Sequence, residues 1–141
     1  MSQDFTKRLS IIIDRSLPAW KAMNTVAHIS AYFGHTFKEN FGTGEFFNTK
    51  DGADLPRNTQ YPIIIFAAEH DAVQSFAKDI RENTNVQKMF FTNEMVESTD
   101  DEEIQTITTQ KAFDEVEILG VGIFGEHATV KTLTKKFKLW S

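Results

Sequence analysis

The chain has no cysteine among its 141 residues. This absence excludes a disulfide framework, a thiolate nucleophile and a metal cage built from cysteine. Positive charge is scarce as well, because 15 Lys and Arg residues stand against 20 Asp and Glu residues and the net charge is −5. An acidic chain repels a phosphate backbone overall, so nucleic acid is not expected as a partner.

Long apolar runs are also missing. No segment approaches the length that crosses a bilayer, and the stretch "MSQDFTKRLSIII" places charges before a very short apolar run, unlike a signal peptide. We therefore expect a soluble, cytoplasmic protein with no membrane partner. Hydrophobic residues make up 40% of the chain, which is enough to bury one core, so residues 1–141 are expected to form a single domain.

Four short apolar segments have the character of strands. Residues 9–13 and the stretch "YPIIIFAA" lack polar alternation, which is typical of strands buried on both faces, and the second is expected to be central in the sheet. The stretch "VQKMFFTN" is a third strand, and "VEILGVGIFG" is a last strand whose glycines mark a close packing contact. Helical patterns lie between these strands, so the sequence predicts a layered α/β domain with a largely parallel sheet.

The first helical pattern directly follows the first strand. Ser16 is expected to be its N-cap, Pro18 lies in its first turn, and Gly34 is a natural stop. Small and apolar residues recur at spacings of three and four, as on a helix face that packs on a core: Trp20, Met23, Ala27, Ser30 and Gly34.

Other local signals place the remaining elements. A "KDG" turn between "EFFNT" and "DLPRN" predicts a small surface hairpin, and Thr99 with Glu102 has the spacing of a capping box at a helix start. A helix is expected after the second strand, with one apolar face formed by Ala72, Val73, Phe76, Ala77 and Ile80. A C-terminal helix is expected to carry one stripe of Val130, Leu133, Phe137 and Trp140.

Four stretches resemble a known fold in their order and character. "LSIIIDRSLPAWKAMNTVAHISAYFG", "YPIIIFAAEHDAVQSFAKDI", "KMFFTN" and "ILGVGIFGEHATVKTLTKKFKLW" are similar to the class II peptidyl-tRNA hydrolases. "LPAWKAMNTVAHISAYFG", the "DG" turn and "YPIIIFAA" resemble more closely an uncharacterised bacterial family, domain of unknown function number two thousand. The resemblance implies a three-layer α/β/α domain, a mixed, mostly parallel sheet of four to five strands, and a homodimer.

The resemblance also implies a site where the first strand meets the first helix. The general rule that ligands gather at the carboxyl ends of strands in open α/β sheets agrees with this place. By alignment with the hydrolases, Lys21 and Asn24 fall at their paired lysines, His28 at a glutamine and Asn93 at an aspartate. Asparagine does not take a proton near neutral pH, so we expect this site to bind more readily than it catalyses.

Three functional hypotheses follow. The leading one is a non-catalytic domain that binds a small-molecule or peptide-like ligand, with Lys21, Asn24 and His28 facing Thr92 and Asn93 across a pocket. The alternative is a divergent hydrolase of peptidyl-tRNA or of an aminoacyl ester or amide, with Lys21 as the electrostatic group and His28 as the base. The third is a structural or protein-interaction domain that uses the phenylalanine-rich segment from Phe37 to Phe47.

Each candidate residue also has an ordinary explanation. A lone histidine on an apolar stripe, such as His28, is usually a core residue, and a first-turn lysine such as Lys21 usually extends into solvent. His28 and His35 are seven residues apart, but two histidines without a third ligand are weak support for a metal. We therefore expect neither a metal nor a cofactor.

Overall fold

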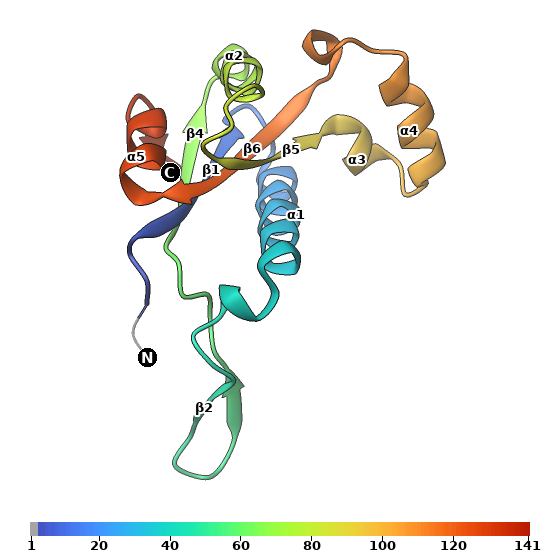
Figure 1. Ribbon diagram of the computed structural model, residues 1–141. Helices are drawn as coiled ribbons and strands as arrows, with labels where there is room; N and C mark the ends of the chain where they lie inside the picture. Colours follow the sequence, from blue (N-terminus) through green and yellow to red (C-terminus); the bar gives the residue numbers. More distant parts are fainter. Residues whose placement is uncertain (1–2) are drawn as a thin grey trace.

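The computed structural model describes residues 3–141, which are built around a sheet of five strands. The order across the sheet is β5-β6-β1-β4-β7 (Figure 1). The strands span Lys7–Asp14 (β1), Ile63–Ala68 (β4), Gln87–Thr92 (β5), Ile118–Glu126 (β6) and Lys138–Leu139 (β7). The predicted α/β class with four to five strands is confirmed.

The sheet is mixed, but the prediction that it is mostly parallel is wrong. Only β1 and β4 pair in parallel, while β1–β6, β4–β7 and β5–β6 are antiparallel. The reason is the connection from β5 to β6, which begins and ends at the same end of the sheet, with Thr92 paired to Ile118. β6 therefore returns antiparallel and separates β5 from β1.

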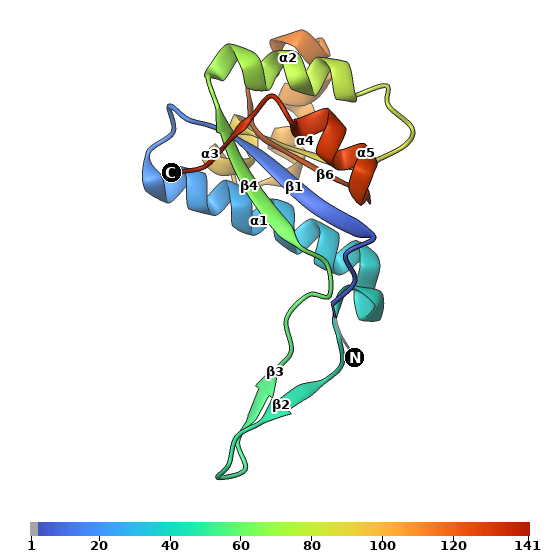
Figure 2. The ribbon, with the colours of Figure 1, turned by 90° about the vertical axis from the view of Figure 1, so that its left-hand side faces the viewer.

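Helices cover both faces of the sheet (Figures 1 and 2). Helix α1 (Ala19–Phe37) packs on one face, and α2 (His70–Ile80) and α5 (His127–Thr134) pack on the other. Each side has its own core, because alternate residues of β1 point to opposite faces, with Ile11 and Ile13 toward α1 and Ile12 toward α2. The predicted layering of helices about a sheet is confirmed.

Glycines in β6 bring α1 close to the sheet. A Cβ atom at Gly120 would lie 2.6 Å from Cγ2 of Thr25, and one at Gly122 would overlap Ile29. The predicted close contact at these glycines is therefore present, and α1 is the element that makes it.

The face that α1 buries differs from the predicted one. The buried residues are Ala22, Thr25, Ile29 and Phe33. On the predicted stripe, Trp20 is 60% exposed and Met23 is 63% exposed. Helix α1 has apolar residues on two faces, and the close fit to the β6 glycines decides which one is buried.

The predicted boundaries of α1 need correction as well. Pro18 is the N-cap, and the helix ends at Phe37 rather than at Gly34. Ser16 does not cap it, because its hydroxyl donates to Asp14 at 2.6 Å instead.

The predicted hairpin is present as β2 (Phe46–Asn48) paired with β3 (Asp54–Pro56). A short 3₁₀ turn, Lys38–Phe41, leads into it from α1, and the hairpin extends away from the sheet (Figure 2). The phenylalanine-rich segment is thereby divided in two. Phe37 and Phe41 pack against the core on the α1 side, whereas Phe46 and Phe47 are exposed.

The segment between β5 and β6 holds two helices and a 3₁₀ turn: α3 (Asn93–Glu97), α4 (Asp101–Thr109) and Phe113–Glu115. Asp100 is the N-cap of α4, so the capping box predicted at Thr99 is wrong by one residue. Its carboxylate Oδ1 accepts from the N–H groups of Glu102 and Glu103 at 2.9 and 3.3 Å.

The predicted C-terminal helix is too long. Helix α5 ends at Thr134, and the chain then forms β7, in which Leu139 pairs with Phe66 of β4. Val130 faces the core as predicted, but Trp140 lies beyond the helix and is half exposed. β4 was expected to be central, but β1 is the central strand, and β4 lies between β1 and the short edge strand β7, which covers it only at Phe66 and Ala67.

Candidate functional site

The carboxyl ends of three strands lie at one end of the sheet. β1 and β4 are parallel, and β5 points the same way because both β1 and β5 are antiparallel to β6. Helix α1 also begins there, after a connection of four residues from the end of β1. This end of the sheet is where ligands are expected in an open α/β fold, and it carries two groups of polar side chains.

The first group joins Lys21 of α1 to Asn93 of α3. The Lys21 ammonium donates to Oδ1 of Asn93 at 2.8 Å, across 72 residues of sequence. Thr92 is buried beside it, and its hydroxyl accepts from the N–H of Met95 at 3.4 Å, which caps α3. Three of the five predicted site residues therefore lie together.

The other two, Asn24 and His28, line an open groove between α1 and the segment of α3 and α4. His28 is an exposed residue rather than a core residue, and its ring stacks on Phe91 with centroids 5.0 Å apart and planes 21° from parallel. The groove has a volume of about 560 Å³ and is lined by Trp20, Asn24, His28, Met89, Phe91, Met95, Val96, Ser98, Thr99, Asp101 and Ile104. This volume lies in the range of small-molecule sites.

The groove combines apolar surface with a few hydrogen-bonding groups. Trp20, Phe91 and Met95 offer apolar area, while Asn24 and His28 offer donors and acceptors on the α1 side. Lys21 lies on the same helix, one residue from Trp20, and its hydrogen bond ties α1 to α3, the two elements that form the walls. Such a site suits a ligand with an apolar or aromatic body and a polar end.

An ion pair also holds α3 in place. Lys111 donates to Oε1 of Glu94 at 2.6 Å, and the Glu94 side chain is 12% exposed. Burial acts to raise the pKa of Glu94, but the hydrogen bond and the charge of Lys111, together with hydrogen bonds from the backbone and Thr92, outweigh it and hold this pKa below its ordinary value. The α3 wall of the groove therefore depends on a charge pair that lies outside the groove.

The second polar group at this end of the sheet is Asp14 with His70, which the sequence analysis missed. Asp14 ends β1 and is 2% exposed, and its Oδ2 lies 2.7 Å from Nδ1 of His70, the first residue of α2. The other oxygen, Oδ1, accepts from the N–H and the hydroxyl of Ser16 at 2.9 and 2.6 Å. A sequence signal existed, because Asp14 ends β1, His70 follows the end of β4 by two residues, and those two strands pair in parallel.

The pKa values of both side chains in this pair differ from their ordinary values. Burial acts to raise the pKa of Asp14, but the hydrogen bonds from Ser16 and His70 prevail and lower it. The hydrogen bond to Asp14 raises the pKa of His70. An ionised carboxylate only accepts, so Nδ1 of His70 carries a proton and Nε2 is left as the nitrogen that can exchange one with solvent or substrate.

The part of the chain that the structure describes lacks two other features. Among residues 3–141, no group of three His, Asp or Glu side chains is placed to hold a metal ion. Within the same residues, no helix has the length and apolar character that a bilayer span requires.

Comparisons with known proteins agree with this fold. Residues 7–141 match the family described as protein of unknown function (DUF2000). A solved structure of a protein of unknown function from Agrobacterium tumefaciens strain C58 is similar, with a TM-score of 0.84 and 18% identity over 98% of this chain and 100% of that one. No curated protein matches the sequence. Because the family match covers nearly the whole sequence, the chain belongs to the DUF2000 family.

Proposed function

We propose that the protein binds a small-molecule or peptide-like ligand in the groove between α1 and the segment of α3 and α4, without reacting with it. The observation that carries the proposal is the composition of this groove. Aromatic and aliphatic side chains supply most of its surface, and Asn24 and His28 supply hydrogen bonds on one wall. Specific ligand sites typically combine these two kinds of surface.

Lys21 adds a charge preference. Its ammonium donates to the neutral amide of Asn93 rather than to a carboxylate, so its positive charge is not offset by that partner. Lys21 adjoins the groove beside Trp20, whereas the carboxylate of Asp101 lies in the lining on the α4 wall. A ligand with an apolar or aromatic body and a carboxylate therefore gains from both features when its carboxylate lies nearer to Lys21 than to Asp101. An N-acylated amino acid, or the C-terminal residue of a peptide, has this chemistry.

The proposal is tested with the fluorescence of Trp20. The chain has two tryptophans, so Trp140→Phe leaves Trp20 in the groove as the single reporter. Titration with N-acetyl-L-phenylalanine is expected to change this fluorescence at lower concentration than titration with its uncharged amide. His28→Ala and Lys21→Ala should weaken binding, and Lys21→Ala should abolish the preference for the carboxylate.

His35→Ala is the matched control, because His35 is an exposed residue of the same helix and lies outside the groove. Equal affinities for His28→Ala and His35→Ala would show that the groove is not the binding site.

We also propose that the protein is cytoplasmic and forms a homodimer, as the sequence and the family resemblance predict.

Hydrolysis of an ester or amide, with peptidyl-tRNA as the substrate that the resemblance implies, is the second candidate. The Asp14–His70 pair favours it, because a carboxylate that orients an imidazole is a common arrangement for a general base. His70 would then take the role that the sequence analysis gave to His28, whose ring stacks on Phe91.

A turnover assay with peptidyl-tRNA separates these possibilities. Cleavage that survives His28→Ala and is lost with His70→Gln would support hydrolysis with His70 as the base. Cleavage that survives Lys21→Ala, His28→Ala and His70→Gln alike would come from a contaminating enzyme. No cleavage by the wild-type protein would refute hydrolysis of this substrate and leave the binding proposal to the fluorescence test.

A further inference from the structure

The β2–β3 hairpin exposes apolar side chains on both of its faces. Phe47 pairs with Leu55 across the strands, and Phe46 pairs with Pro56, so the two pairs point to opposite faces. Phe46, Phe47 and Leu55 are between 45% and 53% exposed. An isolated hairpin of two short strands is marginally stable in water, so this one gains stability when another surface covers it.

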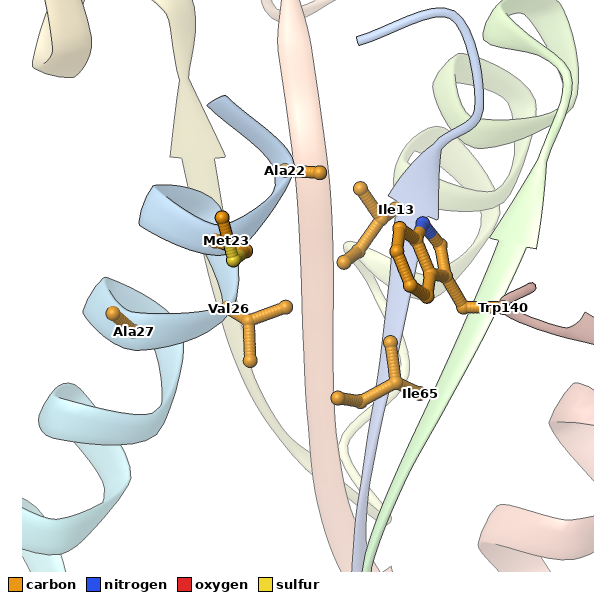
Figure 3. A pocket seen from close by; sticks show the side chains of 7 residues that line it. All are labelled: Ile13, Ala22, Met23, Val26, Ala27, Ile65 and Trp140. Atoms are coloured by element: carbon orange, nitrogen blue, oxygen red, sulfur yellow. The ribbon is translucent and has the colours of Figure 1, made fainter. Parts of the chain in front are cut away.

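An apolar pocket lies toward the other end of α1. It has a volume of about 240 Å³, and every residue that lines it is apolar: Ile13, Ala22, Met23, Val26, Ala27, Ile65 and Trp140. Figure 3 shows Met23 and Val26 of α1 on one side and Ile65 and Trp140 on the other. A dry cavity of about 150 Å³ holds a benzene ring, so this pocket has room for a phenylalanine side chain.

The pocket continues onto an open sheet edge. β7 pairs with β4 only at Phe66 and Ala67, and the backbone N–H of Trp140 donates to the carbonyl oxygen of Ile65 at 3.0 Å. Ile63, at the start of β4, is 36% exposed. An uncovered edge with apolar side chains is a place where another chain can pack.

We infer that a second copy of this chain covers this face, with the hairpin of each subunit lying in the apolar pocket of the other. The hairpin follows the C-terminal end of α1, and the pocket lies in the N-terminal half of the same helix. When two copies pack with their α1 helices antiparallel, a two-fold axis across the helices brings each hairpin to the partner's pocket. The two contacts are then identical, as a closed dimer requires.

Dimensions support this arrangement. Helix α1 has 19 residues and is therefore about 28 Å long. The hairpin arm from Gly42 to its turn at Gly52 contains ten residue steps, which reach up to about 33 Å when extended. The arm is therefore long enough to reach the N-terminal half of an antiparallel partner helix.

The apolar area is also sufficient. With one face of the hairpin in the contact, five partly exposed side chains are available in each subunit: Phe47, Leu55, Met23, Ile63 and Trp140. At roughly 100 Å² each, which is about half the area that a large side chain buries, they supply about 500 Å². A standard interface buries about 800 Å² per partner, and backbone and polar atoms at the rim supply the remainder.

Charge complementarity favours the same partner. The tip of the hairpin carries Lys50 and Asp51 in the turn and Asp54 at the start of β3, which together are acidic, and all three are exposed. The cation Arg57 lies at the base of the hairpin, with its guanidinium 4.6 Å from the centroid of the Phe47 ring. The C-terminal segment that leads to Trp140 carries Lys135, Lys136 and Lys138. The acidic turn of one subunit would therefore meet the basic segment beside the partner's pocket, which orients the hairpin.

Because the chain has no cysteine, single introduced cysteines test the contact directly. A mixture of Phe47→Cys and Met23→Cys proteins is expected to form a disulfide between the two kinds of subunit under mild oxidation. Phe5→Cys mixed with Met23→Cys is the control, since Phe5 is exposed and lies outside the hairpin and the pocket.

The mass in solution provides the second measurement, by sedimentation over a range of concentrations. Phe47→Ser with Leu55→Ser on the hairpin, or Met23→Lys at the pocket, should each weaken dimerisation at least tenfold, whereas Phe5→Ser should not. These side chains are exposed, so the monomer should keep its far-UV circular dichroism.

Three results would overturn the inference: a wild-type monomer at the highest soluble concentration, a dimer that all of these variants leave intact, or equal cross-linking by the Phe5→Cys control. Ligand binding is scored separately by Trp20 fluorescence, so failure of the dimer contact and failure of the groove proposal can be told apart.

Discussion

Replacement of Gly122 by alanine tests the packing that positions α1, and with it Lys21, Asn24 and His28. A methyl group at this position would overlap the Ile29 side chain and lie 2.8 Å from Cε2 of Phe33. Ile29 and Phe33 are both fully buried, so neither has free space into which it can move. Adding a methylene-sized group to a packed core costs about 1–3 kcal/mol.

The expected result is therefore a measurable loss of stability. For a chain of this size, 1 kcal/mol corresponds to about 4 °C in Tm, so Gly122→Ala should lower Tm by about 4–12 °C. Urea denaturation should give a lower midpoint with an unchanged m-value, because the surface exposed on unfolding stays the same.

Gly34→Ala is the matched control, at a glycine of α1 that lies outside this contact. Gly34 lies within α1, and a Cβ there would meet its nearest neighbour, Cδ1 of Phe41, at 3.8 Å, which is ordinary van der Waals contact. Alanine is the better helix former, so this variant should gain up to about 1 kcal/mol. If Gly122→Ala leaves Tm unchanged or raises it, the close approach of α1 to β6 described above is incorrect.

Three further predictions concern charges and caps. Because the pKa of His70 is raised, its contribution to the free energy of unfolding is full below the ordinary value of 6.5 and is lost as pH rises through the raised pKa. Because the pKa of Asp14 is lowered, its contribution is full above 3.8 and is lost as pH falls through the lowered pKa. Urea midpoints from about pH 3 to about pH 9 should therefore fall on both sides of this window, and His70→Gln should remove the alkaline fall; an unchanged alkaline limb would contradict the ion pair. Lys111→Met should raise the pKa of Glu94 above its present value, because burial then acts unopposed by the ammonium; an NMR titration that finds no change would refute this. Asp100→Ala should weaken the start of α4 by about 1 kcal/mol, seen as faster amide hydrogen exchange in that helix and not in β1.

Local patterns predicted the elements of this fold well where one physical effect dominated. The β-branched run at 9–13 forms β1, the "KDG" turn joins β2 to β3, and the glycines of β6 lie under α1. The pattern misled where two effects competed. Helix α1 has apolar residues on two faces, and only the position of β6 decides that Ile29 rather than Met23 is buried.

The sheet topology depended on information that no local window contains. Alternating strands and helices suggest parallel strands, but the segment after Thr92 returns to the same end of the sheet, so β6 enters in the opposite direction. The C-terminal stripe was extended to Trp140 for a similar reason, because the spacing of apolar residues does not reveal that the edge of β4 is free to pair with Leu139.

The candidate site was predicted in part. The alignment brought Lys21 and Asn93 to one place, and their side chains are hydrogen bonded. Asp14 and His70 were missed because each looked like the boundary of an element, a strand end and a helix start, and their contact depends on the parallel pairing of β1 with β4. Both side chains lie at the carboxyl ends of parallel strands, where ligands bind in open α/β folds, so their positions in the sequence did carry a signal.

The insertion of β6 between β1 and β5 determines when the site can form during protein synthesis. β5 has β6 as its partner in the sheet, so residues 87–92 have no strand to pair with until residues 118–126 have left the ribosome. Before that moment Thr92 and Asn93 are not held near Lys21, and β1 has one open edge. Pairing between segments distant in sequence is slow, so the nascent chain keeps these edges of β1 and β5 exposed until β6 pairs with them. The groove and the Lys21–Asn93 contact therefore form late in folding, when β6 pairs with β1 and β5, and not when the sheet first nucleates.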